Sequence, residues 1–220
     1  MKLFDFNKTT PYVKKEGIAG YFQLLYENFF DLILVNLLFV LFCVPIITIG
    51  SSYKALIMVC NKITNDEVVS IISDFIQFFK SDFVKSSFYG LLFLLTFIAI
   101  DFALVFYAIA SVNIKAMGIL CSICIGCHII LSGILLFFSI IYTQVSQSFT
   151  LLIRNSIVLL FLNVKTFLLV FVYIILIVFI IWALSPYSWP VILILPFSLI
   201  ALANSYFLLP IVKKSFNLWR

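Results

Sequence analysis

The sequence predicts an all-α protein, a polytopic bundle of transmembrane helices. Of its 220 residues 65% are hydrophobic and only 10% are charged, and the mean hydropathy is +1.24, whereas a soluble domain carries about 25% charged residues. Long apolar stretches recur from residue 21 to residue 212, and most can cross a hydrocarbon core about 30 Å thick. We therefore expect a single membrane domain over residues 1–220, which crosses the plasma membrane several times and contacts the lipid bilayer.

Six membrane spans are expected, and the chain before them is short. The expected spans cover residues 21–44, 51–61, 86–111, 117–143, 164–184 and 191–211. The preceding residues 1–20 carry lysines but lack the short apolar core and cleavage site of a signal peptide. We expect them to form a cytoplasmic N-terminal segment.

The second span is the weakest, because it is too short to cross the bilayer without its flanking residues. Positive charge collects on the cytoplasmic side of membrane proteins. Six crossings with both termini in the cytoplasm place all of the 14 Lys and Arg residues there except Lys54 and Lys115. Without the second crossing, the Lys and Arg residues are divided less unevenly between the two sides of the membrane, so six spans are favoured. The alternative is five spans plus one re-entrant or interfacial helix.

A turn motif separates the first two spans. Pro45 cannot continue the hydrogen-bond ladder of a helix, Thr48 can bond the freed backbone groups, and Gly50 permits a left-handed turn. These three residues predict a tight turn at the outer surface, followed by a returning helix.

Two connections are predicted to be amphipathic elbows on the cytoplasmic side, over residues 62–85 and 144–163. Thr64 and Glu67 form a capping-box pattern, and apolar residues then recur at helical spacing up to Phe83. The second elbow has a weaker pattern. Such elbows lie on the membrane or against the bundle, and they can also dock a neighbour. The candidate docking residues are Asp74, Phe75, Phe79, Lys80, Arg154 and Asn155.

Asp101 is the most unusual residue, because it lies deep inside an apolar stretch where a carboxylate costs about 2.5–3.5 kcal/mol. His128 is the only histidine, and it lies at matched depth if the third and fourth spans form an antiparallel hairpin. Lys54 is a competing partner for Asp101, and Asn36 lies at similar depth. We therefore expect an intramembrane polar site of these four residues. It serves either as a proton or solute relay or as a buried cluster that fixes helix packing.

No catalytic, cofactor or metal site is predicted. Cys121, Cys124 and Cys127 superficially resemble an iron–sulfur run, but a fourth cysteine is missing and a continuous helix spreads the thiols along a stripe. Small residues at a close helix contact explain the run better. Glu27 and Asp31 could form an acid/base pair, although carboxylates there more often sit at headgroup level. The basic residues behind the net charge of +5 are scattered at segment ends, which indicates membrane orientation and no nucleic-acid partner.

Residues 31–50 resemble the signature of the YesL-like family of bacterial integral membrane proteins, a domain family of unassigned function. Further similarity lies at Ala55–Leu56, in the first elbow and around residues 154–166, and Val44, Ser51 and Lys54 depart from the pattern. The resemblance covers about residues 14–175. The matching positions of the signature are Asn36, Leu37, Leu38, Phe39, Pro45, Thr48 and Gly50.

The resemblance implies a role beside carbohydrate uptake and degradation in Gram-positive bacteria, and it implies no catalytic residues. We therefore expect a non-catalytic accessory membrane protein that binds the permease of a sugar ABC importer or a membrane sensor subunit. The alternative is a small transporter or channel that works through Asp101 and His128.

Overall fold

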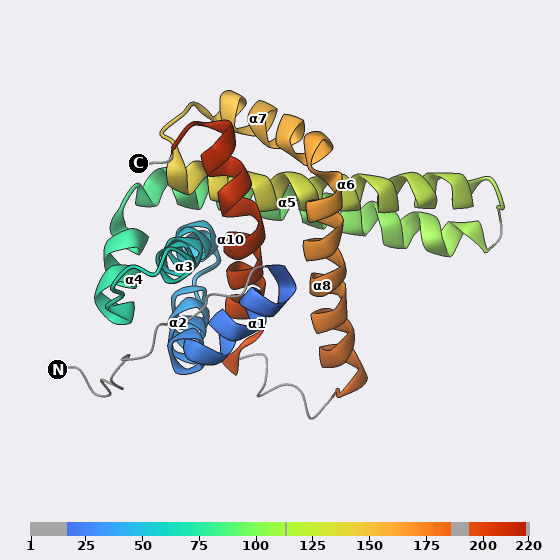
Figure 1. Cartoon of the computed structure of the whole chain (residues 1–220). Helices are drawn as coiled ribbons and strands as arrows, with labels where there is room; N and C mark the ends of the chain where they lie inside the picture. The colour runs from blue at the N-terminus through green and yellow to red at the C-terminus, as the bar shows by residue number, and fades with distance from the viewer. Residues whose placement is uncertain (1–16, 113, 186–193, 219–220) are drawn as a thin grey trace.

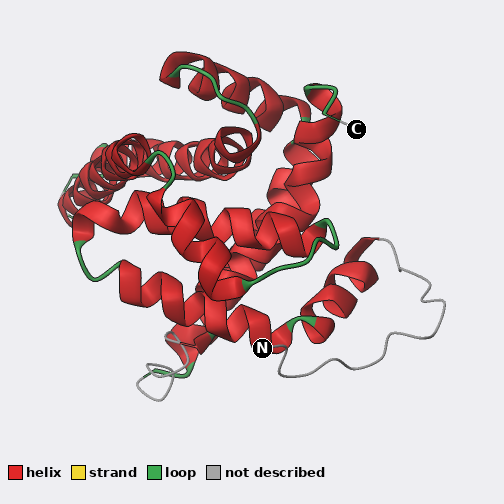
Figure 2. Ribbon diagram, turned by 90° about the vertical axis from the view of Figure 1, so that its left-hand side faces the viewer, coloured by secondary structure: helices red, strands yellow, loops and turns green. Residues whose placement is uncertain are grey.

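The computed structural model describes residues 17–112, 114–185 and 194–218, and these residues form helices joined by loops, with no strand among them (Figures 1 and 2). The start of the chain and the beginning of the expected sixth span lie outside the described residues. The helices are α1 Gly17–Glu27, α2 Phe29–Phe42, η1 Ile46–Thr48, α3 Ile49–Thr64, α4 Ile71–Lys80, α5 Phe83–Ser111, α6 Met117–Gln144, α7 Phe149–Leu162, α8 Val164–Ala183 and α10 Pro196–Ser215.

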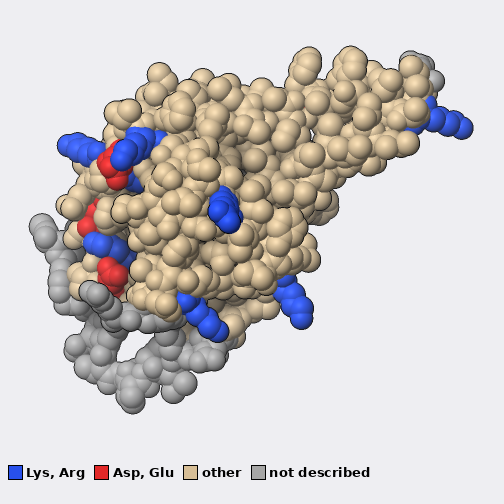
Figure 3. All heavy atoms as spheres, turned by 90° about the horizontal axis from the view of Figure 1, so that it is seen from above, with Lys and Arg blue, Asp and Glu red and all other residues tan. Residues whose placement is uncertain are grey.

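The two longest helices, α5 and α6, form an antiparallel hairpin that extends away from the other helices (Figure 1). At 1.5 Å per residue the 29 residues of α5 are about 43 Å long. Between Ser86 and Thr143 the only charged residues are Asp101 and Lys115. The face of the hairpin seen in Figure 3 shows charged side chains only at its far end, and most charged side chains visible in this view gather over the opposite part of the molecule. This surface suits hydrocarbon.

In the part of the chain that the structure describes, four helices are long and apolar enough to cross a membrane, namely α5, α6, α8 and α10. The pair α1 and α2 would add a fifth crossing, but a 76° bend separates the two helices. The sequence predicts one continuous helix there. The structure corrects this with a bend at Asn28, whose backbone N–H and side-chain amide both donate to the Leu24 carbonyl, at 3.1 and 2.9 Å.

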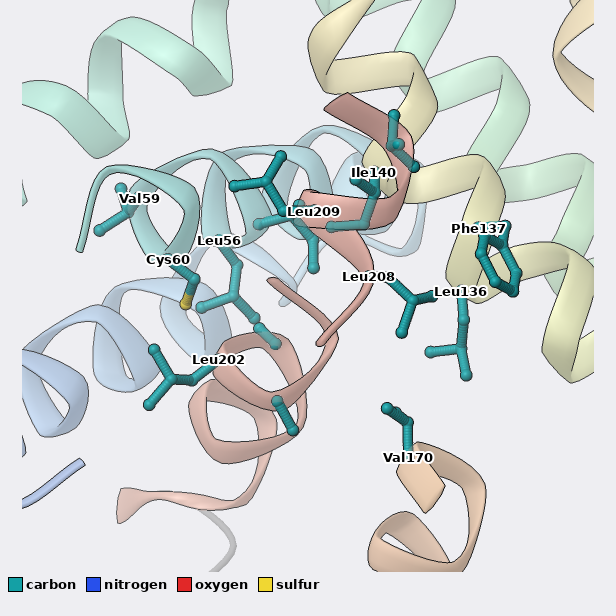
Figure 4. Close-up of a cluster of buried hydrophobic side chains, with 14 of the residues drawn as sticks. Leu56, Val59, Cys60, Leu136, Phe137, Ile140, Val170, Leu202, Leu208 and Leu209 are labelled. Atoms are coloured by element: carbon teal, nitrogen blue, oxygen red, sulfur yellow. The ribbon is translucent and has the colours of Figure 1, made fainter. Parts of the chain in front are cut away.

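The core is built around α3, which is buried along most of its length. Helices α2, α4, α5, α6 and α10 all pack against it. Figure 4 shows how Leu56 and Cys60 of α3 face side chains of α6 and α10. The other labelled core residues are Val59, Leu136, Phe137, Ile140, Val170, Leu202, Leu208 and Leu209.

The position of α3 contradicts a second span that runs alongside the hairpin. Near its start, Ser51 bonds the hydroxyls of Ser86 and Ser87 at 2.7 and 2.8 Å. Ten residues later, the Asn61 amide donates to the Thr143 hydroxyl at 3.0 Å. The first turns of α5 and the last turns of α6 lie at the same end of the hairpin, so α3 lies across that end. The described residues thus do not confirm six spans, because α3 is not among the helices long and apolar enough to cross a membrane.

The capping signal also acts differently from the prediction. Thr64 closes α3 and donates to the Cys60 carbonyl at 2.9 Å, so it is no N-cap. Helix α4 begins later, where the Asp74 carboxylate accepts the Ser70 backbone N–H at 2.9 Å. Pro196 begins α10 at its first turn, a position where its missing N–H costs nothing.

Candidate functional site

A large apolar groove of about 1010 Å³ lies where the α5–α6 hairpin meets α8 and the core. Its volume is at the upper end of the range of ligand pockets in proteins, about 300–1,000 Å³. Gly50 and Tyr53 of α3 close its inner end, and α8 contributes one wall. The wall is rich in aromatic side chains, which are Phe39, Phe93, Phe97, Phe171, Phe179, Trp182 and Phe197.

Asp101 and His128 both line this groove, and they are in contact. The Asp101 Oδ1 and His128 Nδ1 atoms are 3.1 Å apart, as the matched depth in the hairpin predicts. The two groups satisfy the distance of an ion pair, but His128 Nδ1 makes no well-aligned hydrogen bond. The imidazole packs edge-on against the Phe97 ring, with 5.2 Å between ring centroids. The pair therefore places one carboxylate and one imidazole on an otherwise apolar wall.

Lys54 does not join this pair, and it lies at the base of the hairpin. Its amine donates to the backbone carbonyl of Ser81 and, at 3.0 Å, to the Ser81 hydroxyl. Burial lowers the pKa of the Lys54 amine, an effect that the nearby carboxylate of Asp82 partly opposes. The sequence predicts Lys54 and Ser81 on opposite faces of the membrane, so their contact corrects the expected depth of α3.

Asn36 is also separate from Asp101. Its side chain is fully buried, and Oδ1 accepts the backbone N–H of Ser198 at 2.9 Å. Ser198 lies in the first turn of α10, where backbone N–H groups have no partner within the helix. Asn36 therefore caps α10 from α2. The expected four-residue polar site reduces to Asp101 and His128.

The turn motif has one confirmed and one corrected part. Thr48 donates its hydroxyl hydrogen bonds to the freed carbonyls of Phe42 and Pro45, at 2.5 and 2.6 Å. Gly50 lies in the first turn of α3 and has no positive φ. Its role is a helix crossing, because a Cβ atom built on Gly50 would strike the Ser86 carbonyl oxygen and come within 2.8 Å of the Gly90 Cα atom.

Gly90 and the serines beside it complete this crossing, and no prediction from the sequence includes them. Ser86 and Gly90 are four residues apart, which is the small-xxx-small spacing of close helix contacts in membranes. The Ser51 hydroxyl also donates to the Phe83 carbonyl at 2.9 Å. The spacing alone could have identified α5 as the partner of the Gly50 turn.

Of the six candidate docking residues, three are engaged within the chain. Phe75 is fully buried, Phe79 packs on Phe42 with ring centroids 4.7 Å apart, and Asp74 pairs with Lys62 at 3.0 Å. Helix α4 therefore packs against the bundle, the second of the two arrangements expected for the elbow. These three side chains therefore contact other parts of the same chain.

The other three candidates lie nearer the surface. Lys80 and Arg154 are exposed. Half-buried Asn155 donates its side-chain amide to the Gln147 side-chain carbonyl at 2.8 Å. Lys80 and Arg154 are thus the members of the set that remain on the surface.

The cysteine run of α6 lies on the hairpin. Cys121 and Cys124 are half-buried and Cys127 is exposed, and all three are free thiols. In residues 17–112, 114–185 and 194–218 no three His, Cys, Asp or Glu side chains come together as a metal site would need.

Comparisons with known proteins identify similarity in the first half of the chain. Residues 32–103 match the model of a family described as "Protein of unknown function, DUF624", which is about a third of the chain. No curated protein and no solved structure matches. The matched segment contains Asn36, the Pro45–Gly50 turn, Gly90 and Asp101. The similarity to this uncharacterised family therefore covers the α3–α5 crossing and one half of the Asp101–His128 pair.

Proposed function

We propose that this protein is a non-catalytic accessory subunit of a larger membrane assembly, and that it holds a hydrophobic segment of a partner in the groove. The observation that carries the proposal is the groove itself. It is large and its wall is almost wholly apolar, and its lining includes bulky side chains that remain exposed, such as Trp182, which is 73% exposed. Large exposed apolar surfaces mark sites of protein or membrane interaction.

The partner that we propose is the permease of a sugar ABC importer or a membrane sensor subunit. This part of the proposal comes from the resemblance of residues 31–50 and the first elbow to a family that accompanies carbohydrate uptake. A permease or sensor crosses the membrane as helices, and a helix of a partner can approach the groove through the lipid without leaving the bilayer.

A photo-crosslinking residue at Leu104, which lines the groove, tests the proposal in the native membrane. Phe102 is the matched control, because it lies two residues away on the same helix and does not line the groove. We expect the residue at Leu104 to crosslink to a transporter or sensor subunit, identified by mass spectrometry, and the residue at Phe102 to give no such product. Lipid adducts alone at both positions would contradict the proposal.

A second candidate function is a small transporter, which the Asp101–His128 contact on the groove wall favours. Transporters place ionisable groups beside cavities within the membrane, and the two groups could pass a proton. If this candidate is correct, Asp101→Asn will lower proton flux into proteoliposomes at least tenfold. Flux in the variant equal to that of the unaltered protein, or no flux above empty vesicles in either, would exclude it.

A further inference from the structure

Asp101 is the only carboxylate among the described residues that line the groove. The other ionisable side chains on the groove wall are His128 and Tyr53, and every remaining lining residue is uncharged. An ionised carboxylate inside an apolar environment is costly unless a partner compensates it. His128 lies beside the carboxylate but makes no well-aligned hydrogen bond to it, so it satisfies the group only in part.

The Asp101 carboxylate is open to the groove. Only Oδ1 approaches His128 Nδ1, and that contact is not a well-aligned hydrogen bond. The Asp101 side chain remains 58% exposed. Since an ionised carboxylate has about four acceptor positions, it can take at least one further strong donor from the groove side.

The groove wall on α5 continues into a helix face that is long enough for a whole transmembrane helix. Gly90, Leu94, Phe97, Asp101 and Leu104 recur at helical spacing along the lining of α5. The same face reaches Ala108, seven residues after Asp101. From residue 90 to residue 108 the helix rises about 27 Å, close to the thickness of the hydrocarbon core.

Helix α6, the other helix of the hairpin, also allows a partner helix to approach closely. On α6, Gly118 lies seven residues before the lining residue Ile125 and on the same face. A Cβ atom built on Gly118 would meet nothing within 4 Å. Small residues beside a long face allow helix backbones to pack closely in membranes.

From the charge, the exposure and the length of this face, we infer that the occupant of the groove is a transmembrane helix that carries one lysine or arginine near its middle, paired with Asp101. This inference rests on the proposed function, and it names the chemistry of the partner. Asp101 lies near the centre of the face, eleven residues after Gly90 and seven before Ala108. Ionisable residues within membranes pair with one another, so a central cation complements the groove.

Synthetic helices test this pairing without knowledge of the natural partner. The full-length protein is reconstituted in phosphatidylcholine vesicles with a leucine–alanine helix that carries one central lysine. The control helix carries norleucine at that position, and binding is measured by energy transfer between labels. We expect the lysine helix to bind about tenfold more tightly than the control, and Asp101→Asn to abolish the difference.

A variant with the opposite charge distinguishes the loss of a specific pairing from misfolding. The Asp101→Lys variant should prefer a helix with a central glutamate over the helix with a central lysine, the reverse of the unaltered protein. Equal binding of the lysine and norleucine helices by the unaltered protein would overturn the inference. So would a lysine preference that survives in Asp101→Asn.

The crosslink at Leu104 separates this inference from the accessory role. If Asp101→Asn keeps the crosslink to a transporter or sensor subunit at full yield, the charge pairing is wrong and the accessory role stands. If the Leu104 crosslink joins two copies of this chain, or yields lipid adducts only, both proposals fail.

Discussion

Gly50→Ala is expected to lower the free energy of unfolding by about 3 kcal/mol or more, because the new methyl group has no space. It would strike the Ser86 carbonyl oxygen and lie within 2.9 Å of the Gly90 backbone nitrogen. These are backbone atoms of α5, which cannot rotate away as a side chain can. For a chain of this size the melting temperature in detergent should fall by about 6 °C or more, as measured by intrinsic fluorescence.

Gly118→Ala is the matched control for this variant. It also replaces a glycine within a helix of the same chain, but a Cβ atom there meets nothing within 4 Å. Alanine is favoured over glycine in a helix by up to about 1 kcal/mol, so Gly118→Ala should preserve or raise the melting temperature. Equal melting of the two variants would show that α3 and α5 do not cross at Gly50 and Gly90.

Phe75→Ala is expected to cost about 3–5 kcal/mol of stability, the usual range for a buried phenylalanine. The Phe75 side chain is completely buried, and its ring centroid lies 5.5 Å from that of Phe42 on α2. Its loss would leave a cavity between α4 and the bundle. Chemical denaturation in mild detergent, followed by circular dichroism, measures the change.

Ile72 lies on the same helix and is 53% exposed, so Ile72→Ala is the control. Its substitution should change stability by less than about 0.5 kcal/mol. If instead Phe75→Ala were as stable as Ile72→Ala, α4 would not be packed against the bundle, and its apolar face would again be available to the membrane or to a partner.

The sequence predicts the long elements of this fold well, since apolar length and short loops determine them. The expected spans 86–111, 117–143 and 164–184 coincide closely with α5, α6 and α8. The contact of Asp101 with His128 follows from the same hairpin. A short loop between two helices determines which of their residues lie at the same depth. Local sequence patterns therefore predict the structure correctly where consecutive helices also pack against each other.

The failures concern contacts between segments that are distant in sequence. Lys54 and Asn36 were placed beside Asp101 by depth alone, and depth does not reveal which helices are adjacent. The position of α3 across the end of the hairpin depends on Ser51, Asn61 and Gly50, whose partners lie 32 to 82 residues away. A hydropathy pattern describes each helix singly, so it cannot distinguish a short buried helix from a short span.

The capping of α10 by Asn36 has a consequence for how the chain assembles during translation. α10 is synthesised after every other helix of the structure, yet its first turn is completed by α2, and the Tyr21 hydroxyl donates to the Leu199 carbonyl at 3.2 Å. While the ribosome is still making the preceding helices, the buried amide of Asn36 has no α10 to bind. The contacts of α1 and α2 with α10 can therefore form only after α10 has been synthesised, so this part of the interior closes late in assembly.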